Sequence, residues 1–205
     1  MNGANPQIEP RKRRVMPGAE RRQMILSAAL TLFARDGYTG CEVEQIAREA
    51  GVGKGTIYRY YPSKQELFLA LVDRGYELLQ ARMLKSRDMT LDVAERFKRG
   101  MQAHVDFFLE NPDYYRVMML ELPDHRLKLS GDIMKRHQRY IQPLVNAIRA
   151  SVDSGEFKQI DSEFTAFTIA AISCTVIERY LRGRGDTLQR DIEAAIEMFL
   201  HGVCK

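Results

Sequence analysis

Residues 37–67 read GYTGCEVEQIAREAGVGKGTIYRYYPSKQEL, and this stretch decides the fold that we expect. Apolar residues recur at the spacing of one helical face from Val43 to Ala50, and Gly51 follows where such a helix would end. A glycine turn then leads into a very short helix over residues 54–60. Two short helices joined by a glycine turn are typical of a helix-turn-helix motif.

The second short helix carries side chains that suit nucleic acid. A helix over residues 54–60 is about 10 Å long, which is compact enough to present its N-terminal end to a DNA major groove about 12 Å wide. Ile57 should face inward, while Gly55 lets the backbone approach a ligand closely. Lysines in this region would neutralise phosphates. The candidate DNA-binding residues are Lys54, Gly55, Thr56, Tyr58, Arg59, Tyr60 and Lys64. The alternative interpretation is a plain helical hairpin.

The distribution of charge favours nucleic-acid binding over the plain hairpin. Residues 1–64 hold 11 Lys/Arg and 6 Asp/Glu, whereas residues 65–205 hold 20 and 21, although the whole chain has a net charge of only +4. This asymmetry indicates a polyanion-binding module joined to a larger neutral one.

Residues 1–18 lack helical periodicity and contain three prolines and the basic run Arg11-Lys12-Arg13-Arg14. We expect a flexible arm there. Its charges either form a solvated tail or contact phosphates, and the sequence leaves both possibilities open.

The rest of the chain reads as helical throughout. A first helix over about 20–36 should end at Gly37 in the left-handed conformation. Ser63 and Glu66 form a capping-box pattern that starts a helix reaching about residue 85. Asn111 should act as the N-cap of a helix whose first position is Pro112. The later helices are expected at about 90–110, 112–122, 128–153, 162–182 and 187–203.

The helix over 162–182 is apolar nearly all round, so both of its faces should be buried. One face can pack on its own domain and the other on a second subunit, with the last helix adding a second apolar stripe. The candidate dimer residues are Ile169, Ile172, Val176, Ile192, Ile196 and Phe199. The alternative is a core helix of a monomer.

Polar or soft side chains on otherwise apolar helix faces are the candidates for a small-molecule pocket. His104 and His137 each lie on such a face, and Met118 and Met119 would suit an adaptable apolar lining. An effector bound there would be apolar or amphipathic. The alternative is that these histidines and methionines are ordinary core residues.

Residues 37–67 resemble the DNA-binding signature of the TetR family of bacterial transcriptional regulators. The resemblance covers the Gly37-Tyr38 turn, the helix ending in Ala50-Gly51-Val52, the Gly55-Thr56-Ile57-Tyr58 core of the recognition helix, and Lys64 with Leu67. It implies a homodimer that binds a palindromic operator on double-stranded DNA, and a C-terminal domain whose small-molecule effector alters the spacing of the two DNA-reading heads. By position, Thr56, Tyr58 and Lys64 match family residues that hold DNA. Cys41-Glu42 departs from the threonine or serine usual in the family, and we expect no DNA contact at Glu42.

Several other classes of protein fit the sequence poorly. Three widely spaced cysteines form neither a disulfide framework nor a zinc knuckle. The longest apolar stretch, 14 residues from Phe164 to Ile177, is shorter than a membrane span, and no signal peptide is visible. Residues 51–56 look like a phosphate loop, but Arg48 and Gly55 break that pattern. We therefore expect a cytoplasmic protein that is not an enzyme and needs no metal or cofactor.

The sequence thus predicts an all-α protein with an N-terminal three-helix helix-turn-helix domain and a C-terminal helical domain. The expected boundaries are a flexible basic arm over 1–18, a DNA-binding domain over 19–65, and an effector-binding and dimerisation domain over 66–205. The expected function is a ligand-responsive DNA-binding regulator, and we expect a repressor rather than an activator. A helical protein-interaction scaffold, or an enzyme with no visible active site, is the alternative.

Overall fold

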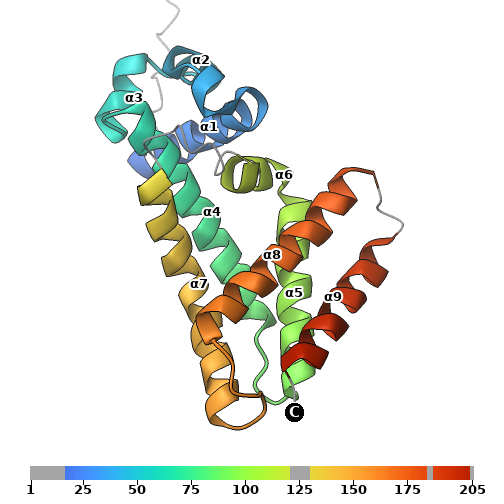
Figure 1. Cartoon of the computed structure of the whole chain (residues 1–205). Helices are drawn as coiled ribbons and strands as arrows, with labels where there is room; N and C mark the ends of the chain where they lie inside the picture. The colour runs from blue at the N-terminus through green and yellow to red at the C-terminus, as the bar shows by residue number, and fades with distance from the viewer. Residues whose placement is uncertain (1–16, 121–129, 184–186, 204–205) are drawn as a thin grey trace, which may run out of the picture.

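The computed structural model describes residues 17–120, 130–183 and 187–203, so most of the predicted arm over 1–18 lies outside the described residues. The all-α prediction is confirmed for these ranges, whose regular elements are helices (Figure 1). They are α1 (Gly18–Gly40), α2 (Val43–Glu49), α3 (Lys54–Tyr60), α4 (Lys64–Ser86), α5 (Val93–Glu110), α6 (Pro112–Tyr115), the π-helix η1 (Arg116–Leu120), α7 (Ser130–Asp153), α8 (Ser162–Leu181) and α9 (Leu188–Val203).

Helices α1, α2 and α3 form an N-terminal unit with its own core at the top of Figure 1. The apolar stripe of α1 packs against α2 and against the start of α4. The ring of Phe33 meets the ring of Phe68 edge to face, with centroids 5.1 Å apart, and Tyr38 stacks on Phe33 and meets Phe68 edge to face. The fully buried side chains that join these helices are Ile25, Phe33, Ile46, Ile57, Leu67 and Phe68. This core fixes the orientation of the short helix α3.

Two glycines with positive φ give the unit its turns. Gly37 has φ 72° and breaks α1, as the sequence predicts, and Cys41 N–H donates to Gly37 O at 3.2 Å in the turn that follows. Gly51 has φ 63°, and after it Val52 N–H donates to Ala47 O at 2.9 Å. A side chain at either position would be strained in this backbone conformation.

Helix α4 begins at the predicted cap and continues from the N-terminal unit into the larger domain. Ser63 Oγ accepts from Glu66 N–H at 3.0 Å, which confirms the Ser63 half of the predicted capping box. At α2 the other bond of a capping box is present, from the N-cap backbone to the side chain three residues later: Gln45 Oε1 accepts from Glu42 N–H at 2.8 Å. The predicted boundary at 65–66 falls within the first turn of α4, so one continuous helix connects the N-terminal unit and the larger domain.

Helices α4 to α9 form the larger domain, whose long helices run roughly alongside one another (Figure 1). Helix α5 lies at its centre and contacts α4, α8 and α9, while α7 packs on α4 and α8. Ion pairs connect neighbouring helices. Arg82 holds Glu110 between α4 and α5 at 2.9 Å, Arg136 holds Asp73 between α7 and α4 at 2.8 Å, and Arg179 holds Asp191 between α8 and α9 at 2.8 Å.

The segment after α5 differs from the predicted helix over 112–122. Pro112 occupies the first helical position and Asn111 the N-cap position, as predicted, but the Asn111 side chain makes no hydrogen bond to the first turn of α6. Its Nδ2 donates to Phe107 O at 2.8 Å, so the side chain caps the last turn of α5 instead. After Tyr115 the chain widens into η1, and residues 121–122 lie outside the described residues.

Gly75 of α4 allows α6 and η1 to approach closely. A Cβ at this position would lie 2.4 Å from Met118 Sδ and 2.8 Å from Tyr114 Cδ1, and both side chains are buried. We expect Gly75→Ala to destabilise the fold by about 1–3 kcal/mol because the crowded core must shift. Gly131→Ala is the control, since a Cβ at that exposed helical position meets nothing within 4 Å. Thermal unfolding of both variants checks this prediction, and an unchanged midpoint for Gly75→Ala would contradict it.

Candidate nucleic-acid interface

The N-terminal end of α3 is presented to solvent by the core beneath it. Ile57 points inward and is 1% exposed, as predicted. Lys54, Gly55, Tyr58 and Arg59 are exposed, whereas Thr56 and Tyr60 are half-buried. A Cβ at Gly55 would meet nothing within 4 Å, so the backbone there is open to a ligand. The predicted residues of this helix are therefore brought together on one surface.

Two guanidinium groups lie close to the ring of Tyr60. Arg59 is 5.5 Å and Arg22 of α1 is 5.7 Å from the centroid of its ring. Arg22 was not among the predicted residues, because nothing in residues 37–67 shows that the start of α1 lies beside the end of α3. Its only signal was a basic pair in the first turns of α1. The surface thus gains a positive charge from a second helix.

Lys64 supplies a third positive charge at the turn between α1 and α2. Its Nζ donates to Thr39 O at 3.4 Å and lies 4.9 Å from the centroid of the Tyr38 ring. These contacts place the ammonium group beside the N-terminal end of α2, although Lys64 itself belongs to α4. A phosphate at this position would meet a lysine that is already oriented.

Lys54 pairs with a carboxylate of the preceding helix. Its Nζ forms an ion pair with Glu44 Oε1 of α2 and lies 5.7 Å from the centroid of the Tyr58 ring. The hydrogen bond to Glu44 raises the pKa of Lys54 and lowers that of Glu44, so both groups are charged at neutral pH. Lys54 was predicted to neutralise phosphate, but in this state its charge is shared with a side chain of the protein.

Removing the Glu44 charge should strengthen the binding of any polyanion at this surface. In Glu44→Gln, Lys54 is freed and a carboxylate near the ligand is lost, while an exposed ion pair contributes little to stability. We expect several-fold tighter binding to double-stranded DNA and a steeper dependence of affinity on salt. Fluorescence anisotropy with a labelled duplex measures both quantities. Glu193→Gln on α9 makes the same charge change outside this unit, and an equal gain there would show that only net charge matters.

Three of the predicted pocket residues, His104, Met118 and His137, are fully or partly buried in the larger domain. His104 of α5 and Met118 of η1 are buried, at 8% and 0% exposure, and His137 of α7 is half-buried. The side chain of Met119 lies outside the described residues. His137 stacks on Phe167 of α8 with ring centroids 5.6 Å apart. Two histidines that are far apart in the sequence are thus brought into one interior.

Three polar atoms in this interior have no hydrogen-bond partner: Tyr76 Oη, His104 Nδ1 and His137 Nε2. We call Tyr76, His104 and His137 the buried polar cluster. The ring centroid of Tyr76 is 6.4 Å from that of His137 and 4.8 Å from that of Tyr140. Burial, followed by the nearby His137, lowers the pKa of His104 to about 4. Burial also lowers the pKa of His137 and raises that of Tyr76, so the cluster is uncharged at neutral pH.

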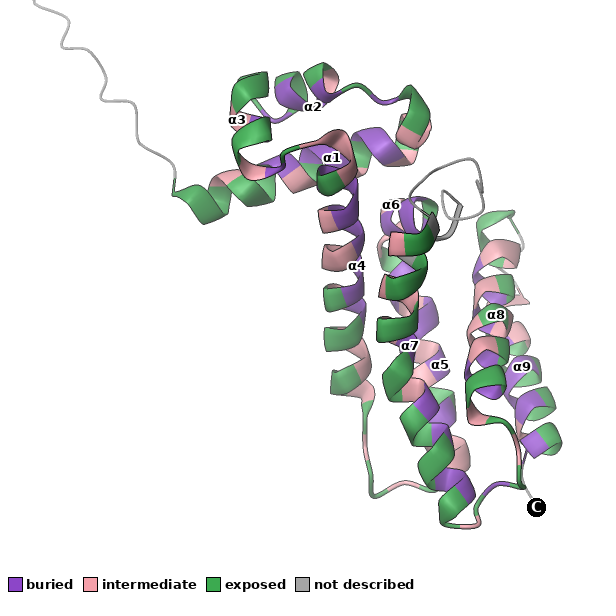
Figure 2. Cartoon of the chain, turned by 60° about the vertical axis from the view of Figure 1, so that its left-hand side comes forward, coloured by how far each residue is buried: buried purple, intermediate pink, exposed green. Residues whose placement is uncertain are grey.

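Most of the predicted dimer residues lie inside the single chain. Ile169, Val176 and the three residues of α9 (Ile192, Ile196 and Phe199) are buried within the single chain, because α8 and α9 pack on each other and on α5, and Ile172 is half-buried. They form the subunit's own core and offer little surface to a partner. Figure 2 shows exposed residues alternating with buried ones along both helices. The exposed residues at helical spacing are Phe164, Thr168, Ala171 and Thr175 of α8 and Arg190, Ala194 and Met198 of α9.

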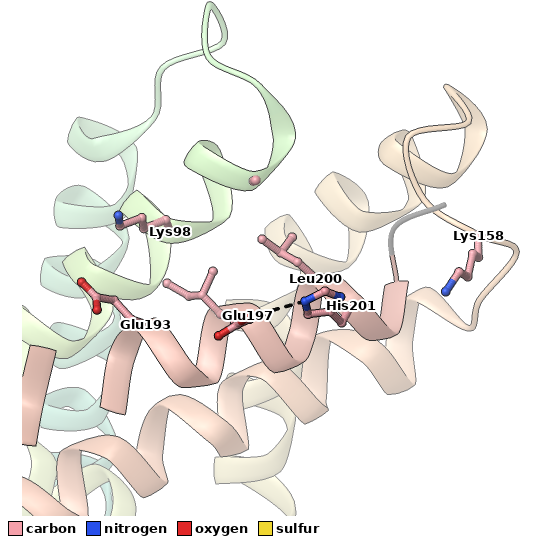
Figure 3. A pocket seen from close by; sticks show the side chains of 8 residues that line it. Lys98, Lys158, Glu193, Glu197, Leu200 and His201 are labelled. Atoms are coloured by element: carbon pink, nitrogen blue, oxygen red, sulfur yellow. Dashed lines mark ion pairs between the residues drawn. The ribbon is translucent and has the colours of Figure 1, made fainter. Parts of the chain in front are cut away.

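An open groove between the start of α5 and the outer side of α9 contains none of the predicted pocket residues (Figure 3). His201 and Glu197 face each other there, with 3.7 Å between Nε2 and Oε1. The groove is lined by Ala94, Lys98, Lys158, Glu193, Ile196, Glu197, Leu200 and His201. In the part of the chain that the structure describes, no three His, Cys, Asp or Glu side chains gather as metal ligands would.

Two family models match the chain. The model described as bacterial regulatory proteins of the tetR family matches residues 25–71, and the one described as the tetracyclin repressor-like C-terminal domain matches residues 90–203. The chain belongs to the TetR family. Helices α2 and α3 are therefore the helix-turn-helix of a transcription regulator, and α5 to α9 form the TetR-type C-terminal domain.

Individual relatives agree with this assignment over most of the chain. An uncharacterised HTH-type transcriptional regulator of Bacillus subtilis (strain 168) is 22% identical over 88% of this chain and 95% of its own length. The fatty acid metabolism regulator protein of the same organism is 27% identical over 66% of this chain and 70% of its own. A crystal structure of a TetR-family regulator from Shewanella sp. PV-4 superposes with a TM-score of 0.80 at 21% identity, covering 90% and 98% of the two chains.

Helix α8 of this TetR-family protein has the length and composition of a membrane span, with a mean hydropathy of 1.3. In the structure one side of it packs against α5, α7 and α9, whereas residues such as Phe164 on its other side are exposed. The apolar stretch from Phe164 to Ile177 is shorter than a span, but the whole helix is long enough. One such helix is weak evidence for a membrane protein, and the family consists of DNA-binding regulators.

Proposed function

We propose that this TetR-family protein is a ligand-responsive repressor in the cytoplasm that binds a palindromic operator as a homodimer. The observation that carries the proposal is the exposed N-terminal end of α3 on a three-helix core, with Arg22 and Arg59 beside Tyr60 at the other end of the helix and Lys64 beside Thr39. The family assignment favours this function over a protein-interaction scaffold or an enzyme.

In this proposal, α3 enters the major groove and the surrounding residues hold the phosphates. Gly55 allows close approach of the helix backbone, and the Thr56 hydroxyl lies where it can reach base edges. Tyr58 and Tyr60 offer hydroxyls to the sugar-phosphate backbone, while Arg59 and Lys64 supply positive charge. Lys54 exchanges Glu44 for phosphate when DNA is bound.

The second subunit packs on the exposed face of α8 and α9. Phe164 is 72% and Met198 62% exposed, which is far more than such large apolar side chains usually show. The other residues of this face on α8 are small, so a helix from a second copy can approach closely. Four helices, two from each subunit, would then bury this face and set the distance between the two DNA-reading heads.

Helices α6 and η1 connect the effector region to the DNA-reading unit. Both contact α1, and Met118 of η1 packs on Gly75 of α4. An effector that enters the interior between α4, α5 and α7 would displace these contacts and so shift α1 relative to the larger domain. Release of DNA requires that the effector bind the non-DNA conformation more tightly than the DNA-bound one.

The effector that we propose is small and apolar or amphipathic. The interior that would receive it consists of aromatic and aliphatic side chains with a few polar atoms, which is the usual composition of small-molecule sites. The name of the Bacillus subtilis relative, a fatty acid metabolism regulator, points to the same chemistry.

Selection of genomic fragments by the purified protein tests this function. We expect a small set of fragments that share a palindrome, and the genes beside them should indicate the class of effector. Recovery of fragments without a shared site would contradict the proposal, because a non-specific cationic surface binds all duplexes alike.

Two variants should distinguish a contact to phosphate from a contact to bases. Lys64→Ala removes a diffuse charge, so we expect weaker binding to every duplex and a salt slope lower by about one unit. Thr56→Val keeps the shape of the side chain and removes the hydroxyl, so we expect altered preference among operator sequences with little change in the salt slope. Titrations of operator and scrambled duplexes over a range of salt concentrations measure both effects. If both variants bind like the wild type, DNA lies on another surface.

A further inference from the structure

The buried polar cluster contains more unpaired polar atoms than the core of a folded protein usually does. His104 and Tyr76 are 8% and 5% exposed, and His104 Nδ1, Tyr76 Oη and His137 Nε2 have no partner. Nearly all buried polar atoms in folded proteins are paired, and the exceptions call for a missing group. The three atoms come from α4, α5 and α7, where Tyr76 lies beside His137 and His137 acts electrostatically on His104, so one further molecule could complete them.

Among the described residues, the groups packed directly on the cluster are aromatic rings, and the charged side chains beside it already form an ion pair with each other. The rings packed on it are Phe108 of α5, Tyr140 of α7 and Phe167 of α8. Besides its own members, the titratable groups facing it are Tyr140 and Cys174, and burial raises the pKa of both, which keeps them uncharged. The nearest charged side chains, Asp73 and Arg136, pair with each other at 2.8 Å.

We propose that the buried polar cluster binds an uncharged hydrogen-bonding group, such as a hydroxyl, an ester or an amide, at the buried end of an apolar effector. This assignment rests on the proposed function for the existence of an effector. It adds the chemical class of the group that reaches His104, His137 and Tyr76.

The hydrogen-bonding capacity of the cluster matches such a group. A neutral imidazole offers one donor and one acceptor, and a tyrosine hydroxyl can both donate and accept. A carboxylate only accepts, so it would need a positive partner, and an ammonium only donates, so it would need a negative one. The low pKa of His104 agrees with this, because forming an imidazolium beside a carboxylate would require uptake of a proton in a buried site.

Three probes of equal chain length test the head group without DNA. Calorimetric titration of the full chain with decan-1-ol, decanoate and decylammonium at pH 7 should give tightest binding for decan-1-ol, by about tenfold or more. Its affinity should stay constant from pH 6 to 8, and its binding heat should not depend on the ionisation heat of the buffer. Tighter binding of decanoate with proton uptake would overturn the uncharged class, and failure of all three to bind would overturn the site.

Variants show whether the cluster makes the contact. His104→Phe and His137→Phe should each weaken binding of decan-1-ol by about tenfold, the effect of a lost hydrogen bond. They should unfold at the same temperature as the wild type or higher, because each removes an unpaired buried atom. His201→Phe changes an exposed histidine and should bind like the wild type. A destabilised His104→Phe that still binds decan-1-ol normally would make these histidines ordinary core residues.

These results separate the inference from the function on which it rests. A protein that selects no operator but binds decan-1-ol through His104 and His137 would keep the site and lose the proposed function. A protein that selects an operator but binds decanoate best, with uptake of a proton, would keep the function and lose the uncharged class.

Discussion

Gly55→Glu should abolish specific DNA binding while leaving the fold intact. A side chain at Gly55 meets nothing within 4 Å in the protein, so the substitution creates no internal clash. A carboxylate near the N-terminus of α3 even favours the helix, because it interacts well with the helix dipole. At the DNA surface, however, it places bulk and negative charge where the backbone should approach the major groove. We expect operator affinity to fall by about 100-fold or more, since like charges at such contacts cost several kcal/mol.

The same substitution at Gly202 is the matched control. Gly202 lies in α9, at the end of the molecule away from the helix-turn-helix unit (Figure 1), and it also has open space around a Cβ. Gly202→Glu should therefore bind the operator like the wild type. Anisotropy titrations, with circular dichroism to confirm the helical content, give the comparison. Near-normal operator binding by Gly55→Glu would mean that α3 does not enter the groove.

Ala171→Glu should split the dimer. Ala171 is exposed on α8 in the single chain, so a glutamate there leaves the subunit fold undisturbed. In the proposed dimer the same carboxylate would be buried against a second copy without a partner, which costs several kcal/mol. Each DNA-reading head would then hold only half of the palindrome. We expect a monomer in sedimentation experiments and operator affinity lower by about 100-fold, because the second head no longer benefits from the first.

Ala81→Glu makes the same change on the exposed side of α4, which the proposed interface does not include. This variant should sediment as a dimer and bind the operator normally. If Ala171→Glu remains a dimer, a different face joins the subunits. If it becomes a monomer without loss of operator affinity, the two heads do not act together on one palindrome.

Local patterns in the sequence predicted the N-terminal unit closely. The limits of α3, the break at Gly37 and the cap at Ser63 follow from interactions within a few residues, and the structure places all three as predicted. Asn111 shows the limit of such patterns. Its side chain could form a hydrogen bond either with the end of α5 or with the start of α6, and the structure shows that it caps α5.

Contacts between distant segments were harder to predict. The sequence showed that α8 is apolar nearly all round, but the packing of α5 and α9 decides which of its faces the subunit covers. Residues such as Ile169 and Val176, which the sequence assigned to the dimer, are therefore buried in the single chain, and the dimer face stays a prediction. Arg22 was missed for the same reason, and so was the pairing of Lys54 with Glu44. His104 and His137 could be proposed one by one, but Tyr76 had no signal until α4 was placed beside α7.

The central claim, that this TetR-family protein reads a DNA sequence, is tested most directly by comparing a selected palindrome with its scrambled version over a range of salt concentrations. We expect the palindrome to bind about 1,000-fold tighter or more at physiological salt, with two subunits on each duplex. Both affinities should fall steeply as salt rises, because phosphate contacts release counterions. Equal affinity for the two duplexes at every salt concentration would contradict the account.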